Sequence, residues 1–135
     1  MSAIEIPKPD PRILARRAEI LAGLAALVPP TSLITEEDER RAYETDALTA
    51  YRRVPLAVVL PETTEQVSRV LTFLNQEGVK VVARGAGTSL AGGAIPSEDA
   101  VVLDVSKMCR ILDVDTANRT IRVEAGVTNL GVSGA

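Results

Sequence analysis

Residues 79–93, with the sequence VKVVARGAGTSLAGG, constrain the fold of this chain more than any other stretch. The valine-rich start is typical of a β-strand, and after Arg84 it leads into a loop with four glycines and two small hydroxyl residues. Glycine loses more conformational freedom on folding than any other residue, so such a cluster needs a physical reason. The stretch predicts a strand that delivers a ligand-binding loop (residues 85–93, the glycine loop), and a surface turn is the alternative.

The glycine loop has the composition of an anion-binding site. Successive small residues let consecutive backbone N–H groups converge on one anion, and the hydroxyls of Thr88 and Ser89 add donors. Each hydrogen bond to a charged acceptor contributes about 1.5–3 kcal/mol, so about three or four of them could hold a diphosphate without a metal. The common phosphate loops do not match. A P-loop needs a Gly-Lys-Ser/Thr ending, and a dinucleotide fingerprint needs glycine where Leu90 stands and a helix that Pro96 would break.

Composition excludes several other functions. The 135 residues suit one domain, and their net charge of −3 comes without a basic stripe or an aromatic platform, which disfavours nucleic acid as a partner. Histidine is absent and Cys109 is the only cysteine, which rules out a zinc site, an internal disulfide and a Ser-His-Asp triad within these residues. The first seven residues lack the pattern of a signal peptide, and no apolar run approaches the roughly 20 residues of a membrane helix. We therefore expect a cytoplasmic protein without a membrane span.

The N-terminal part predicts an extended arm followed by helices. Residues 1–9 are punctuated by proline. Asp10 then acts as the N-cap of an amphipathic helix that stops at residues 29–30, both proline. Its apolar stripe should cover the sheet that follows or a neighbouring domain. Thr35 with Asp38 resembles a capping box at the start of a short charged helix.

A strand, a helix and a second strand follow in about thirty residues, which is the length of a βαβ unit. Residues 54–60 read as a buried strand that Pro61 ends, and Thr63 with Gln66 forms a capping box for the helix. The second strand begins at residue 79. Because the two strands of such a unit are parallel, Pro61 and the glycine loop should lie at the same carboxyl edge of the sheet, where α/β proteins bind ligands.

The remaining segments predict short elements. Residues 43–53 show no clean period and indicate an irregular connection. Residues 101–105 read as another strand, while 111–114 and 120–123 alternate in polarity and predict a hairpin with one solvated face. Thr128 could cap a further helix, which would stop early. We therefore expect the chain to be part of something longer.

Three segments, in this order, resemble the flavin-binding domain of the vanillyl-alcohol oxidase and p-cresol methylhydroxylase superfamily. They are VVLPETTEQV at residues 58–67, ARGAGTSLAGG at residues 83–93, and VEAGV at residues 123–127. Within the superfamily, the sequence is most similar to the FAD-linked subunit of glycolate oxidase and the related D-lactate dehydrogenases.

The resemblance implies an α/β (α+β) fold, with a small mixed sheet that contains the βαβ unit, flanking helices and a C-terminal hairpin. Residues 1–40 would form the N-terminal arm and helices, and residues 41–135 the first lobe of the FAD-binding domain, truncated at its C-terminal end. The loop amides would wrap the FAD diphosphate, with Pro61 near the adenine end. The implied cofactor-binding residues are Pro61, Arg84, Gly85, Ala86, Gly87, Thr88, Ser89, Gly92 and Gly93.

Two loop residues refine what the resemblance implies. Some members tether the flavin to a histidine at the place where Thr88 stands, so FAD would be held non-covalently here. The Arg84 guanidinium could meet a phosphate, or it could brace the loop against a carboxylate such as Asp104. No catalytic base is assigned, because the flavin itself accepts the hydride and the protein supplies position and electrostatics.

Three functions are compatible with these patterns. The first is the FAD-binding portion of an oxidoreductase that oxidises a small 2-hydroxy acid of the glycolate or D-lactate type, with the isolated chain inactive. The second is a non-catalytic half-domain that associates with itself or a partner through exposed apolar surface. The third is a module that binds an ADP-like nucleotide without redox chemistry.

Overall fold

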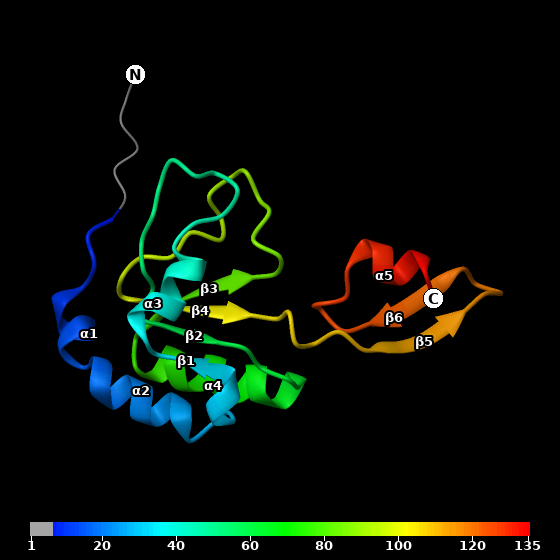
Figure 1. Cartoon of the computed structure of the whole chain (residues 1–135). Helices are drawn as coiled ribbons and strands as arrows, with labels where there is room; N and C mark the ends of the chain where they lie inside the picture. Colours follow the sequence, from blue (N-terminus) through cyan, green and yellow to red (C-terminus); the bar gives the residue numbers. More distant parts are fainter. Residues whose placement is uncertain (1–6) are drawn as a thin grey trace.

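A four-stranded sheet in the order β1-β2-β4-β3 lies at the centre of residues 7–135, the part of the chain that the computed structural model describes (Figure 1). β4 pairs in parallel with both β2 and β3, and β1 pairs antiparallel with β2. The sheet is therefore mixed, as predicted, although β1 was not predicted. Its strands are β1 (Leu33–Ile34), β2 (Ala57–Val59), β3 (Lys80–Arg84) and β4 (Ala100–Asp104).

The predicted strand-helix-strand unit consists of β2, α4 (Thr64–Gln76) and β3. Thr63 caps the helix as predicted, because its Oγ1 accepts a hydrogen bond from the Gln66 amide at 3.2 Å. The Gln66 side chain accepts from the amide of Glu62, at 2.7 Å, where a capping box would use that of Thr63. The two strands are parallel, as expected, but they are not neighbours because β4 lies between them.

Helices cover one face of the sheet (Figure 1). The single predicted helix is two helices, α1 (Pro11–Ala15) and α2 (Arg17–Ala25), and Asp10 caps the first by accepting from the Arg12 amide at 2.9 Å. The apolar stripe of these helices packs against the sheet, which was one of the two expected positions. Of the predicted arm, residues 1–6 lie outside the described residues. The core formed by these helices, α4 and the strands contains Ile13, Ile20, Leu24, Val28, Leu56, Ala57, Val59, Val70, Leu74, Val79, Val101 and Leu103.

Between the N-terminal helices and β2, the predicted short charged helix is present and the predicted irregular connection at residues 43–53 is confirmed apart from its first residue. This segment holds the 3-10 turn η1 (Pro30–Ser32), the one-turn helix α3 (Glu37–Arg40) and the 3-10 turn η2 (Arg41–Tyr43). The predicted capping box is wrong, since Glu36 occupies the N-cap position and its side chain makes no capping bond. The Thr35 carbonyl accepts a hydrogen bond from the Arg40 side chain at 2.9 Å. Thr35 therefore contacts the end of α3 and does not cap its start.

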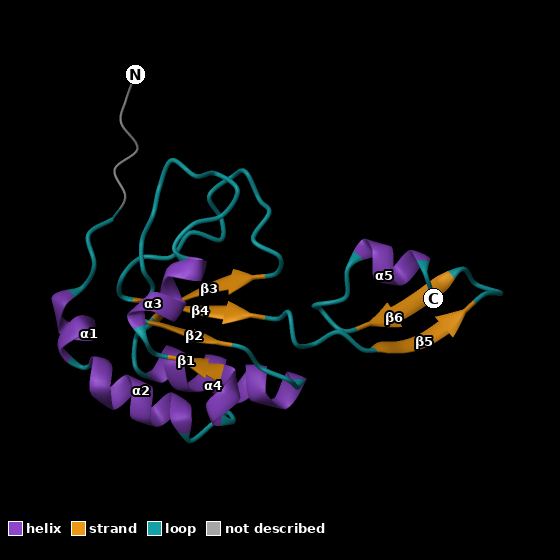
Figure 2. Ribbon diagram, in the orientation of Figure 1, coloured by secondary structure: helices purple, strands orange, loops and turns teal. Residues whose placement is uncertain are grey.

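The predicted C-terminal hairpin is confirmed, but its predicted single solvated face is wrong, because residues 111–114 are all exposed and successive strand residues point to opposite faces. The hairpin projects to one side of the main sheet (Figure 2). It consists of β5 (Ile111–Asp115) and β6 (Thr120–Val123), which pair only with each other among the described strands. Thr128 caps the short helix α5 (Asn129–Ser133), as predicted, by accepting from the Gly131 amide at 3.1 Å.

Two sets of contacts hold the base of the hairpin: one joins its two ends to each other, and the other packs Gly126 against the residues that follow β4. The carboxylate of Glu124 is buried and accepts three hydrogen bonds from Arg110, one from the backbone amide and two from the guanidinium, which together lower the pKa of Glu124. Gly126 then passes so close to the backbone that a Cβ added there would overlap the carbonyl of Val105 and lie 2.8 Å from that of Met108. Only glycine allows this close backbone approach.

Candidate functional site

The carboxyl ends of three parallel strands form one edge of the sheet, and the sequence predicts this for β2 and β3. Pro61 follows β2, Gly85 follows β3, and Val105 follows β4. Because β4 lies between the other two strands, Pro61 and Gly85 stand two strand spacings apart, roughly 10 Å. Pro61 is fully buried, so its ring packs into the protein interior beneath this edge.

The glycines of the loop fall into two groups. Gly87 and Gly92 have φ angles of 68° and 76°, a left-handed conformation that favours glycine. Gly85 and Gly93 do not have positive φ, and a Cβ added to either would meet nothing within 4 Å. Neither backbone conformation nor packing within the protein therefore requires glycine at these two positions. The remaining physical reason for glycine here is that a ligand approaches the backbone closely.

The backbone amides of the first part of the glycine loop lack protein acceptors among the described residues. Within residues 7–135, no amide of residues 85–90 donates a hydrogen bond to another protein group. Thr88 and Ser89 are exposed beside these amides, and Ser89 Oγ accepts from the Ala91 amide at 3.2 Å. Backbone N–H groups are obligatory donors, and several of them in sequence next to glycine form the concave arrangement that attracts anions. The residues present thus fit the diphosphate of a dinucleotide.

Arg84 makes contacts that the sequence did not predict. Its Nη1 donates to the carbonyl oxygen of Thr45 at 2.8 Å, and its Cζ lies 5.4 Å from the centre of the Tyr43 ring. Asp104 accepts instead from the Ser106 amide, so a brace between Arg84 and Asp104 is not seen. Arg84 therefore contacts a carbonyl and an aromatic ring where the sequence suggested a carboxylate. Its contact with a phosphate stays a prediction.

Residues 43–48 also border the loop, which the sequence did not indicate. The Ala47 amide donates to the carbonyl of Ser89 at 3.1 Å. Asp46 is buried beside it: one carboxylate oxygen accepts from the Leu48 amide at 2.8 Å, and the other has no partner among the described residues. The irregular connection that carries these residues has no periodic pattern, so only the Asx-turn tendency of Asp46 could have drawn attention to it.

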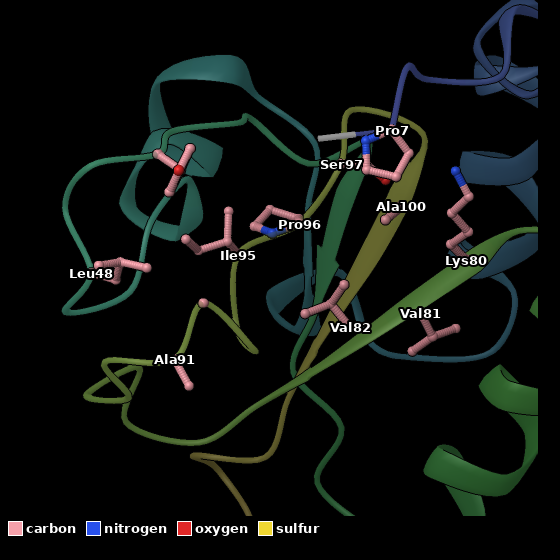
Figure 3. A pocket seen from close by; sticks show the side chains of 12 residues that line it. Pro7, Leu48, Lys80, Val81, Val82, Ala91, Ile95, Pro96, Ser97 and Ala100 are labelled. Atoms are coloured by element: carbon pink, nitrogen blue, oxygen red, sulfur yellow. The ribbon is translucent and has the colours of Figure 1, made fainter. Parts of the chain in front are cut away.

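A cavity of about 490 Å³ adjoins the second half of the loop (Figure 3). Val81 and Val82 of β3 line it on one side and Ile95 and Pro96 on the other, so its walls are mainly apolar. Lys80 and Ser97 also line it, and both hydrogen-bond to the buried Asp99, at 2.7 and 2.5 Å. The cavity touches the loop at residues 91–92, away from the row of free amides.

The described residues show neither a membrane span nor a metal centre. Within residues 7–135, no helix is both long and apolar enough to cross a bilayer. The same residues contain no group of three or more acidic, histidine or cysteine side chains placed to hold a metal ion.

Solved structures share this fold. A 4-ethylphenol oxidase from Gulosibacter chungangensis superposes with a TM-score of 0.81 over 93% of this chain and 25% of its own, at 22% identity. The p-cresol methylhydroxylase with substrate bound superposes with a TM-score of 0.78 over 89% of this chain and 24% of its own, also at 22% identity. At this identity the likeness establishes the fold, which is that of the p-cresol methylhydroxylase type of flavin-binding domain.

Sequence comparisons establish the family. Residues 55–133, more than half of the chain, match the FAD binding domain family. The glycolate oxidase subunit GlcD of Escherichia coli K12 is 43% identical over 119 residues, which are 88% of this chain and 24% of GlcD. The D-lactate dehydrogenase of Archaeoglobus fulgidus is 39% identical over 109 residues, 80% of this chain and 23% of that enzyme. The chain belongs to the FAD-binding domain family, its cofactor is FAD, and it spans about a quarter of the length of these relatives. The predicted resemblance is confirmed.

Proposed function

We propose that the glycine loop holds the diphosphate of FAD non-covalently, as part of a flavin-dependent oxidoreductase that oxidises a small 2-hydroxy acid. The observation that carries the proposal is the row of amides at residues 85–90 without protein acceptors, next to Gly85, where the protein itself does not require glycine. Donors already fixed in place bind an anion without the entropic cost of ordering them first.

The roles of the chain's residues follow from what each can donate. The amides of residues 85–90 supply N–H groups, and the hydroxyls of Thr88 and Ser89 supply O–H groups. Gly92, with its positive φ, lets the chain turn away beside the cofactor, and Gly93 leaves space for the cofactor to approach the backbone. Pro61 supports the edge from beneath. Bound FAD supplies the hydride acceptor, and the residues of this chain bind and orient it. Thr88 offers no imidazole for a covalent tether, which supports non-covalent binding.

The substrate class rests on the relatives. Their names specify glycolate and D-lactate, and both are small 2-hydroxy acids. Because the chain spans about a quarter of those proteins, we place the binding of the hydroxy acid in the parent enzyme and assign it no residue here. A cytoplasmic location is part of the same proposal, supported by a sequence with a single cysteine.

The test is an FAD titration of the purified chain, followed by quenching of flavin fluorescence, with Gly85→Val as the probe variant. A Cβ added at this position meets no protein atom within 4 Å, so the melting temperature should stay near that of the wild type while FAD affinity falls at least about tenfold. Gly134→Ala, at the end of α5, is the matched control and should change neither quantity. Absence of saturable FAD binding, or a Gly85→Val variant that binds FAD normally, would contradict the proposal.

A second function is favoured by a different observation. Ile111, Leu112 and Val114 of β5 and Leu130 of α5 are exposed by 42%, 48%, 48% and 82%. These side chains could serve a non-catalytic half-domain that associates with a second copy or a partner. Light scattering distinguishes the two functions, because a monomer that binds FAD supports the first and an oligomer that does not supports the second. Equal affinities for ADP and FAD would favour the nucleotide-binding module instead.

A further inference from the structure

Two segments that are distant in the sequence are joined next to the proposed FAD site. Residues 43–48, here called the wall segment, touch the glycine loop through the Ala47 amide, which donates to Ser89 O at 3.1 Å. They touch the end of β3 through Thr45 O, which accepts from Arg84 Nη1 at 2.8 Å. The wall segment is itself held in a tight turn, because Thr45 Oγ1 donates to the carbonyl of Leu48 at 3.3 Å.

The guanidinium of Arg84 fills the space beside Gly87. A Cβ added to Gly87 would overlap the guanidinium and lie 2.5 Å from its Cζ. The φ of 68° favours glycine at position 87, and a side chain there would also displace the Arg84 guanidinium. Tyr43 packs on the same guanidinium, so Arg84 joins the wall segment to the middle of the glycine loop.

The charge of Arg84 has no carboxylate partner. Among the described residues, no acidic oxygen lies within 4.0 Å of its guanidinium nitrogens, whereas ten other pairs of basic and acidic side chains meet that limit. A guanidinium remains protonated at all ordinary pH values. An uncompensated positive charge thus lies beside the row of free amides and attracts an anion there.

We propose that the wall segment forms a second wall of the FAD site and that Arg84 is the positioning residue that holds it against the glycine loop. The proposal rests on the proposed function. The wall segment lies outside residues 55–133, the part that matches the FAD-binding domain family, so the family match alone does not assign it to the site. Arg84 acts through Thr45 and Tyr43, and it contributes its charge to the diphosphate from beside Gly87.

A double-mutant cycle on the free protein tests the brace. Gly87→Ala should displace the guanidinium and lower the melting temperature by roughly 5 °C, through loss of the brace and left-handed strain. In the Arg84→Leu background the brace is already lost, so the same substitution should cost clearly less. Equal effects of Gly87→Ala in both backgrounds would show that Arg84 and Gly87 are not coupled, and would overturn the brace.

FAD binding tests the wall. We expect Arg84→Leu to weaken FAD binding about tenfold, as expected when one charge-assisted hydrogen bond is lost, and Arg84→Lys to recover part of the affinity. FAD should slow hydrogen exchange at the amides of residues 46–48 in the wild type but not in Arg84→Leu. Arg122→Leu, an exposed arginine on the hairpin, is the matched control and should bind FAD normally.

The outcomes separate the two proposals. If the wild type binds FAD, but Arg84→Leu binds equally well or exchange at residues 46–48 does not change, the wall is overturned and the proposed function stands. If the wild type binds no FAD, both the proposed function and the role of the wall segment in FAD binding are overturned. The double-mutant cycle still decides whether Arg84 braces the loop.

Discussion

β4 and β5 are both five-residue strands with similar sequences, AVVLD and ILDVD, yet their side chains lie in opposite environments. Every residue of β4 is buried, and no residue of β5 is. β4 has a strand neighbour on each side and a face covered by helices, whereas β5 has only β6. The number of neighbours, and not the local pattern, therefore decides burial. The main sheet carries its own core, and a hairpin of two strands has little intrinsic stability and depends on its attachment.

The largest predicted effect comes from truncating a leucine in that core. Leu74 of α4 is fully buried, so Leu74→Ala should lower the free energy of unfolding by about 2–5 kcal/mol, because it removes apolar contacts and leaves a cavity. Leu112→Ala in the hairpin removes the same atoms from a side chain that is 48% exposed and should cost less than about 0.5 kcal/mol. Urea unfolding followed by circular dichroism measures both, and similar costs would show that the hairpin is as well packed as the main sheet.

The second prediction concerns the junction between the two regions. Gly126→Ala should lower the free energy of unfolding by about 1–3 kcal/mol, since the added methyl group would overlap the backbone carbonyl of Val105 and cannot be relieved by a side-chain rotation. Gly93→Ala, where the methyl group meets no atom, is the control and should be neutral. A tolerated Gly126→Ala would indicate that the hairpin can move away from the main sheet without cost.

Most of the fold could be predicted from the sequence because its signals are local. A capping threonine, a positive-φ glycine at Gly78 and a run of buried valines each specify an element without reference to distant residues. The order of the strands could not be predicted in this way. β4 enters between β2 and β3 through pairings that span dozens of residues, and β1 is only two residues long, too short to give a pattern.

In the candidate site, too, the local features could be predicted from the sequence and the long-range contacts could not. The glycine loop is one continuous segment, and its composition and resemblance indicated the ligand. The contacts of Arg84 with Thr45 and Tyr43 join residues about 40 positions apart, so spacing could not reveal them. A charged side chain near an expected phosphate suggests direct contact when only the sequence is known, whereas the structure gives Arg84 protein partners of its own.

The third prediction concerns how the free energy of unfolding depends on pH through Asp99, which lies next to β4 of the main sheet. Burial alone would raise the pKa of Asp99, but hydrogen bonds from Lys80, Ser97 and the Asp10 amide outweigh burial and lower it to about 2. Because the folded pKa lies below the unfolded value of 3.8, Asp99 contributes about 2 kcal/mol above pH 4, and this contribution is lost as the pH falls through the folded pKa.

Asp99→Asn should therefore lower the free energy of unfolding by about 2 kcal/mol at pH 7, and the difference from the wild type should shrink as the pH approaches 2. Urea titrations at pH 7, 4 and 2.5 measure it. Asp38→Asn on the exposed helix α3 is the control and should leave the stability at pH 7 unchanged. A difference between Asp99→Asn and the wild type that is the same at all three pH values would contradict the assignment.

The smallest effect on stability is predicted for the exposed face of the hairpin, where an effect on association is expected instead. Leu112→Lys changes a side chain that is 48% exposed, so the free energy of unfolding should change by less than about 0.5 kcal/mol. If the apolar side chains of β5 hold copies of the chain together, lysine should shift the molar mass in light scattering toward the monomer, since burying its charge in an interface is costly. Leu71→Lys on α4, at 41% exposure, tests whether any exposed leucine has this effect. Dissociation by both variants would assign association to general surface hydrophobicity, and dissociation by Leu112→Lys alone would assign it to the hairpin, the region that lacks the neighbours the main sheet has.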